Sequence, residues 1–250
     1  MLLLVAFVLR QATARNPLMP LGLFRSRNVV GANLIQMIGA AGMFGTFFLG
    51  ALYLGKIRHY DALEIGLAFL PVTIFMGTLS VRYSERLITR FGARAAALSG
   101  LALMALGLAL FALAPADANY AAQLMPTMVL LGLGAGACFP ALMGLAMSGV
   151  QPDQAGLASG LVNTTAQVGG ALGLAVLATL SSGRATHLAA TGHSATASLV
   201  GGYHLAFWVA TALVVVATGV AAVLLENRST TPEHAPAGAQ PEAEPVTSVG

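Results

Sequence analysis

The chain has 250 residues, of which 57 % are hydrophobic and only 8 % are charged. Its mean hydropathy of +0.80 lies far above the range of soluble globular domains, so a soluble protein is excluded and an integral membrane protein is indicated. The formal net charge of +3 could suit an acidic partner. The positions of the basic residues indicate membrane topology instead, and we expect no nucleic-acid partner.

Six long apolar stretches follow one another along the chain. They are residues 29–54, 62–81, 95–114, 119–148, 155–181 and 204–225. A helix needs roughly 20 apolar residues to cross ~30 Å of hydrocarbon, and each stretch is long enough. None has Lys, Arg or Asp in its central part, and Glu64 lies near an end. The predicted fold class is therefore all-α, a polytopic membrane protein with a six-helix transmembrane bundle.

The segments outside these stretches divide the chain into three parts. We expect residues 1–28 to hold the end of a truncated helix and a cytoplasmic connector, because the apolar run 1–9 is too short to span and lacks the features of a signal peptide. Residues 29–228 would form the bundle. Residues 229–250 are rich in Pro, Ala, Glu and Thr, which predicts a disordered tail.

The basic residues predict the orientation. If the six helices alternate in direction, nine arginines fall on one side of the membrane: Arg10, Arg15, Arg25, Arg27, Arg82, Arg86, Arg90, Arg94 and Arg228. Only Lys56, Arg58 and Arg184 fall on the other side. We expect the protein to lie in the plasma (inner) membrane. The positive-inside rule then places the arginine-rich side, which includes the C-terminus, in the cytoplasm. Connections at 55–61, 115–118 and 182–203 would be external.

The cytoplasmic loop predicted between the second and third helices contains Arg90, Gly92 and Arg94, with Gly77 in the helix before it. This pattern resembles the loop motif of the major facilitator superfamily, although Thr89 occupies the position of the family's Asp. The resemblance implies a gating role, in which the arginines stabilise one conformation through charge-assisted contacts. The alternative is that they are ordinary positive-inside arginines.

The fourth stretch contains a glycine-rich segment that ends in a proline. Gly132 and Gly136 are spaced i, i+4 and would form a close-packing face, and Pro140 could kink the helix. This segment would serve either as a flexible element or as a helix-packing surface alone.

The fifth stretch combines small residues with amides. Its small residues are Gly156, Gly160, Gly169, Gly170 and Gly173, and its amides are Asn163 and Gln167. Most recur at i+3 or i+4 and share one face, and such amides are costly in lipid unless they meet partners or water. The passage resembles the penultimate helix of the fourteen-helix drug:proton antiporters, the QacA/EmrB-like branch of the same superfamily.

The resemblance covers residues 1 to about 228 and implies the C-terminal portion only of such a transporter. In that family the substrate cavity lies between two six-helix bundles. The residues implied to line it here are Asn33 and Gln36 on the first helix, with Asn163 and Gln167 on the fifth. Alternatively, these amides would only bond neighbouring helices. The implied substrate is a small amphipathic or cationic molecule.

Few groups in the sequence could carry other chemistry. Asp61 and Glu64 lie near a helix end, where an anchoring role is favoured, and the chain offers no acid at the middle of a span for proton coupling. The histidines at 187, 193 and 204 match no metal-ligand spacing, and we expect them to lie in a solvated loop. No hydrolase or metalloprotease motif occurs, so we expect neither an enzyme nor a cofactor.

Taken together, these features predict half of a multidrug efflux transporter that works by proton antiport and alternating access. It would need a complementary N-terminal six-helix bundle or a second copy of itself, because one bundle encloses no central pathway. The alternatives are a truncated fragment that transports nothing and a membrane assembly subunit.

Overall fold

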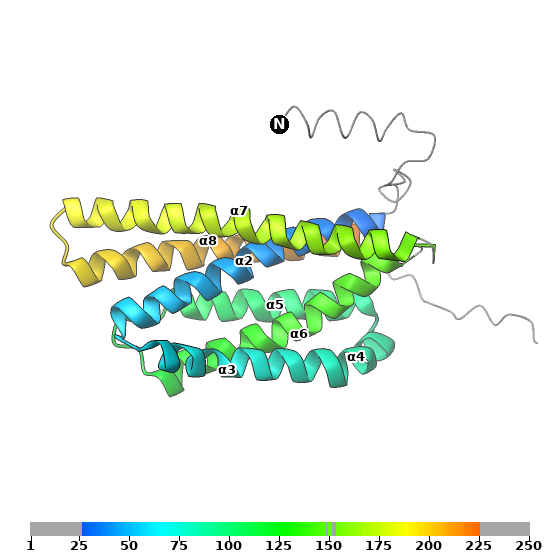
Figure 1. Ribbon diagram of the computed structural model, residues 1–250, viewed down its shortest axis with the longest axis horizontal. Helices are drawn as coiled ribbons and strands as arrows, with labels where there is room; N and C mark the ends of the chain where they lie inside the picture. The colour runs from blue at the N-terminus through cyan, green and yellow to red at the C-terminus, as the bar shows by residue number, and fades with distance from the viewer. Residues whose placement is uncertain (1–26, 149, 152–153, 226–250) are drawn as a thin grey trace, which may run out of the picture.

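The computed structural model describes residues 27–148, 150–151 and 154–225 (Figure 1). All the regular elements in these residues are helical. They are α2 (Arg27–Ile57), α3 (Ala62–Thr78), the π-helix η2 (Leu79–Tyr83), α4 (Ser84–Phe91), α5 (Ala93–Ala112), the π-helix η3 (Tyr120–Leu124), α6 (Met125–Met147), α7 (Ala155–Ala190) and α8 (Ala195–Leu224). The predicted all-α class is confirmed. The expectations for the N-terminal connector and the C-terminal tail concern residues almost wholly outside the described part.

Six helical segments are long and apolar enough to cross a membrane, as predicted. In the span Ala62–Phe91 the π-helical turn η2 joins α3 to α4, and in the span Tyr120–Met147 the π-helical turn η3 leads directly into α6. Figure 1 shows the helices lying side by side with their long axes in the same general direction. The helical conformation pairs the backbone N–H and C=O groups within each span, as a lipid environment requires.

The start of α3 explains an acidic pair at the end of an apolar stretch. The Asp61 carboxylate accepts a hydrogen bond from the Glu64 backbone N–H at 2.8 Å, and the Glu64 carboxylate accepts one from the Asp61 backbone N–H at 2.9 Å. This reciprocal capping box satisfies amides that the first helical turn leaves unpaired. Both carboxylates are exposed and anchor the helix end, as the sequence favoured.

The predicted loop between the second and third helices is wrong in its extent. The helix does not end at residue 81 but continues through η2 and α4 to Phe91, and only Gly92 interrupts the chain before α5. In α4 the side chains of Leu87 and Ile88 pack against the core, while Arg86 and Arg90 are exposed. The arginines lie on one face of an amphipathic helix. Because this short segment contains so many arginines, the helical spacing of its apolar residues was not recognised in the sequence.

The predicted 182–203 loop is also wrong. Helix α7 runs to Ala190 and α8 begins at Ala195, so only a short turn separates them. The Ala and Leu residues of this segment favour a helix, and its Ser, Thr and His side chains are mostly exposed. At 36 residues, α7 is about 54 Å long, longer than the hydrocarbon core. The α7–α8 hairpin therefore extends past the apolar region at this end.

Close backbone approaches hold the core together. A Cβ at Gly100 of α5 would lie 2.6 Å from the carbonyl oxygen of Gly134 in α6, a separation that no side chain tolerates. A Cβ at Gly132 would lie 2.6 Å from the carbonyl oxygen of Val72 in α3. Such contacts between small residues are the main source of helix association in lipid, where apolar burial gives little driving force. They place α6 between α3 and α5.

Candidate functional site

Helices α2 and α7 form a closely packed parallel pair around the middle of both helices. A Cβ at Gly169 would lie 2.7 Å from the Cα of Met37, and one at Gly173 would lie 2.9 Å from the carbonyl carbon of Ala41. Four residues along each helix, Leu177 packs against Gly45. The contacts advance by one turn on both helices, so residues of α2 and α7 that differ by about 132 in number lie at the same depth.

This register brings the four predicted cavity amides to one level of the bundle. Gln36 precedes Met37, and Gln167 lies two residues before Gly169, the residue that touches Met37. Asn33 and Asn163 lie one turn further toward the N-terminal ends of the same helices. Sequence positions 130 residues apart are thereby placed on neighbouring helices at similar depth.

The two amides of α2, buried Asn33 and partly buried Gln36, each have a buried side-chain oxygen. Asn33 is 8 % exposed, and its Nδ2 donates to the Val29 carbonyl oxygen at 2.8 Å. Among the described residues, neither Asn33 Oδ1 nor Gln36 Oε1 has a hydrogen-bond partner. A buried acceptor without a donor costs about 1–3 kcal/mol. These oxygens therefore favour any donor that can reach them.

The two amides of α7 are exposed. Asn163 Nδ2 donates to the Ser159 carbonyl oxygen of its own helix at 3.1 Å, and Gln167 lies one turn further on the same face. On this helix a Cβ at Gly156 or Gly160 would meet nothing within 4 Å. No hydrogen bond within the described ranges joins the α7 amides to those of α2. We call Asn33, Gln36, Asn163 and Gln167 the amide level.

The glycines and the proline that were predicted to pack or flex fall into two groups. Those at 132, 136, 169 and 173 make close backbone approaches to a neighbouring helix, with Gly136 near the Met76 carbonyl oxygen. Those at 156 and 160 face open space. Pro140 lies inside α6, where it has no N–H to donate to the Gly136 carbonyl.

Three of the predicted gating residues, Arg90, Gly92 and Arg94, lie at one end of the bundle, whereas Gly77 lies near the middle of the Ala62–Phe91 span. Gly77 in α3 has open space at its Cβ position, and Gly92 adopts a φ of 85°, a left-handed conformation at the turn from α4 to α5. The guanidinium of Arg90 lies 5.4 Å from the ring centroid of Phe91. Arg94 Nη2 donates to the Ala222 carbonyl oxygen of α8 at 2.6 Å. Arg94 thus ties the start of α5 to the last turn of α8.

Sequence reasoning missed three polar ties at the opposite end of the bundle. The Tyr53 hydroxyl donates to the Pro115 carbonyl oxygen at 2.6 Å, and the Tyr120 hydroxyl donates to that of Ala68 at 2.9 Å. His204 Nε2 lies 2.8 Å from the Ala114 carbonyl oxygen. His204 is therefore a helix residue of α8 rather than part of a solvated loop. Each of these side chains lies near the end of an apolar stretch, and this placement was the available signal.

The described residues contain no group of three or more His, Cys, Asp or Glu side chains that could hold a metal ion. His187 lies in the last turn of α7, and His193 lies in the turn before α8. The acids of the described part are Asp61, Glu64, Glu85 and Asp117, and all lie at helix ends or in connections.

The six spans and the close contacts between them define a polytopic membrane protein with a helical bundle. Residues 5–174 match the family model described as Major Facilitator Superfamily. The chain therefore belongs to the major facilitator superfamily, as its loop and helix motifs suggested.

Curated relatives of this chain are drug resistance and export proteins. The chain is 35 % identical to the puromycin resistance protein pur8 of Streptomyces alboniger, over 91 % of this chain and 46 % of the relative. It is 36 % identical to the cephamycin export protein CmcT of Amycolatopsis lactamdurans, over 72 % of this chain and 37 % of the relative. It is 32 % identical to the tetracenomycin C resistance and export protein of Streptomyces glaucescens, over 71 % of this chain and 33 % of the relative. The chain thus spans less than half the length of these relatives.

Proposed function

We propose that this chain forms one bundle of a drug efflux transporter and that its amide level lines the substrate pathway. The observation that carries this proposal is the pair of buried acceptors, Asn33 Oδ1 and Gln36 Oε1, at the same depth as two exposed amides on α7. Buried unpaired acceptors are retained where a ligand or water supplies the donor. A small amphipathic or cationic molecule, the substrate class that we propose, could donate to them.

The relatives support an export activity. Their names describe resistance to, or export of, puromycin, cephamycin and tetracenomycin C. A site that combines a few amides with apolar side chains can accept ligands of different shape, because apolar contacts repack more easily than ionic ones. This supports the small amphipathic or cationic substrate that we propose, rather than an anionic one.

Transport would require a second bundle. The chain covers 46 % of the length of pur8, and alternating access in this architecture comes from two bundles rocking about a site at their interface. The exposed side chains of the amide level on α7 would face that partner, either a complementary N-terminal bundle or a second copy. The N-terminal ends of α2 and α7 would lie in the cytoplasm, because Arg82, Arg86 and Arg90 lie at that end.

Proton antiport would then rely on an acid in the partner. The described acids lie at helix ends or in connections, where a carboxylate stays solvated and cannot alternate between two sides. We assign the coupling group to the second bundle and the amide level to the substrate.

Efflux of a fluorescent cationic dye from cells tests the proposal. The chain would be expressed alone and together with the N-terminal half of pur8, with dye retention measured over time. Export only in the presence of both halves supports a transporter bundle. Export in neither case would favour a fragment that transports nothing or an assembly subunit.

Residue assignments are tested by replacing both exposed amides. The double variant Asn163→Leu/Gln167→Leu should abolish dye export while membrane insertion stays intact. The matched control is Thr179→Leu, an exposed polar residue of the same helix whose hydroxyl bonds only to the Ala175 carbonyl oxygen. Equal export by the two variants would overturn the amide-level assignment.

A further inference from the structure

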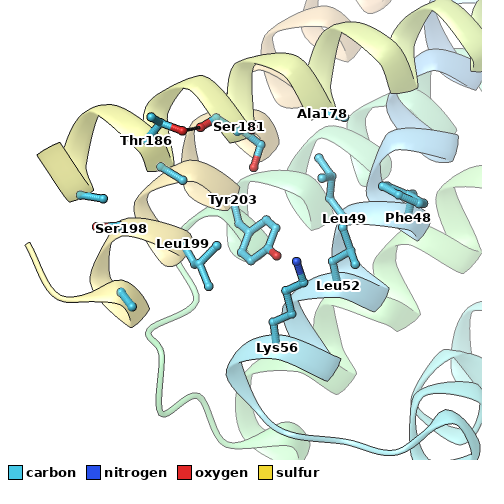
Figure 2. A pocket seen from close by; sticks show the side chains of 14 residues that line it. Phe48, Leu49, Leu52, Lys56, Ala178, Ser181, Thr186, Ser198, Leu199 and Tyr203 are labelled. Atoms are coloured by element: carbon cyan, nitrogen blue, oxygen red, sulfur yellow. Dashed lines mark hydrogen bonds between the residues drawn. The ribbon is translucent and has the colours of Figure 1, made fainter.

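A cavity separate from the amide level lies between the C-terminal halves of α2 and α7 and the first turns of α8 (Figure 2). Its volume is about 480 Å³, within the range of small-molecule sites in proteins. Its walls come from Phe48 to Lys56 of α2, Ala178 to Ala189 of α7 and Ala195 to Tyr203 of α8. None of the four amides lines it.

The cavity exists because α2 and α7 separate beyond their last small-residue contact. Below it, the pair is closed by Gly173 at Ala41 and by Gly45 at Leu177. Beyond that point the helices diverge, which Figure 1 shows as α2 leaving the α7–α8 hairpin. The hairpin is kept together by its own close contact, in which a Cβ at Gly202 would lie 3.2 Å from the Ala185 Cβ.

The walls of the cavity are apolar along most of their length. Leu49, Leu52 and Leu199 contribute aliphatic side chains, and Phe48 lies at the edge with 47 % of its surface exposed. An apolar surface of this kind favours a hydrocarbon chain over a polar ligand.

One end of the cavity carries a single cation. Lys56 is the only lysine in the sequence, and its amine points into the space between α2 and α8 in Figure 2. Lys56 is exposed, and none of the described residues that line the cavity beside it is acidic. An anionic group of a ligand would therefore gain a charge-assisted hydrogen bond there.

The wall on α8 adds an unpaired hydroxyl. Ser198 is only 3 % exposed, and its Oγ has no hydrogen-bond partner among the described residues. Ser181 on the facing wall of α7 is 6 % exposed. Buried hydroxyl groups without partners are uncommon in proteins, and a ligand oxygen is one way to satisfy them.

We propose that this cavity binds an anionic amphiphile with one hydrocarbon chain, its anionic group at Lys56 and its chain along Leu49, Leu52 and Leu199. The ligand class differs from the cationic or neutral drug proposed for the amide level, and binding here does not depend on transport. The amphiphile can come from the bilayer as an anionic phospholipid or from water as a free fatty acid.

The chemistry of Lys56 makes the test selective. The purified 250-residue chain would be placed in phosphatidylcholine nanodiscs and treated with an amine-acylating reagent. The fraction of Lys56 that is acylated would be measured by peptide mass spectrometry, since the only other amine is the N-terminus. Added oleate should slow acylation of Lys56 about tenfold, whereas oleyl alcohol, which has the same chain and no charge, should not. A second arm replaces part of the phosphatidylcholine with phosphatidylglycerol. Protection by phosphatidylglycerol identifies the bilayer source, and protection by oleate alone identifies the free acid.

Variants separate a site from general surface charge. Retention of radiolabelled oleate should fall about tenfold in Lys56→Gln and about threefold in Ser198→Ala. Lys56→Arg should retain most of the binding. The matched control is Arg184→Gln, which removes the exposed cation of α7 that lies at the same end but outside the cavity wall, and which should bind normally. Ala178→Leu should weaken binding by filling the cavity without removing a charge.

Three outcomes would overturn the proposal. The first is equal loss of oleate in Lys56→Gln and Arg184→Gln, which would mean nonspecific attraction. The second is equal protection by oleyl alcohol and oleate. The third is no protection of Lys56 by either oleate or phosphatidylglycerol when circular dichroism shows an intact helical protein. Failure of dye efflux in the transport experiment would leave this result unaffected, since binding is measured on the chain alone.

Discussion

The middle of the α2–α7 pair and its C-terminal part differ in how closely the two backbones approach. Around the middle, Gly169 and Gly173 bring α7 onto the backbone of α2, next to the amide level. In the C-terminal half the helices diverge and leave a cavity of about 480 Å³, lined by leucines and one lysine. Residues without a Cβ, or with only a methyl group, set where two helices in lipid can touch. The same two helices can therefore form a close contact at their middle and a binding space at one end.

The largest expected effect comes from breaking the close contact at the middle of the α2–α7 pair. Gly173→Leu should lower the free energy of unfolding by about 3 kcal/mol, because its side chain would overlap Ala41 of α2. Unfolding of the purified chain in a detergent titration, followed by circular dichroism, measures this effect. Gly160→Leu is the control, since a Cβ there meets nothing within 4 Å. Equal stability of the two variants would contradict the close α2–α7 approach.

A smaller effect is expected at the tie between α5 and α8, at the N-terminal end of α2 and α7. Arg94→Ala should cost about 1.5 kcal/mol, because it removes a hydrogen bond from a charged donor to the Ala222 carbonyl, partly screened by its exposure. Arg86→Ala, an exposed arginine of α4, should cost less than half as much in the same titration. If Arg94→Ala changed transport but not stability, the gating role predicted from the sequence would gain support over a structural one.

The tie at the other end of the bundle is weaker because its donor is neutral. Tyr53→Phe should cost about 1 kcal/mol through loss of the bond to the Pro115 carbonyl, while the ring keeps its contacts. Its edge-on contact with Phe111, at a centroid distance of 5.7 Å, does not need the hydroxyl. A cost as large as that of Gly173→Leu would show that the Tyr53 end of the bundle, rather than the close α2–α7 contact, limits stability.

The smallest effect on stability is expected inside the cavity. Ala178→Leu should change the free energy of unfolding by less than about 0.5 kcal/mol, because the added side chain enters open space instead of a packed contact. The comparison with Gly173→Leu, five residues earlier on the same helix, is direct. Destabilisation of similar size in both would mean that the C-terminal halves also pack closely.

The sequence predicted the number of spans well and their ends less well. Apolar length reports how much helix can lie in hydrocarbon, and all six stretches became helices. It does not report where a helix stops in water. The helix after residue 81 continues to Phe91, and α7 continues to Ala190, because exposed polar side chains are compatible with helix when one face packs. From hydropathy alone, both polar segments were predicted to be loops.

The candidate sites divide in the same way. Asn163 and Gln167 could be singled out because amides in an apolar helix are rare and costly. Their depth relative to Asn33 and Gln36 required the α2–α7 register, which the sequence does not contain. The cavity at Lys56 could not be predicted, since its lining joins residues from 48 to 203 whose only shared property is their place in the fold.

The sequence by itself determined that this protein lies in a membrane, that it is helical and to which family it belongs. Apolar length, composition and short motifs are local properties of the chain. The tertiary structure decided which glycines are contacts and which face open space, since that depends on the neighbour that each helix meets. It also decided where α2 and α7 part. That separation places a buried hydroxyl, an apolar wall and the only lysine of the chain around one cavity.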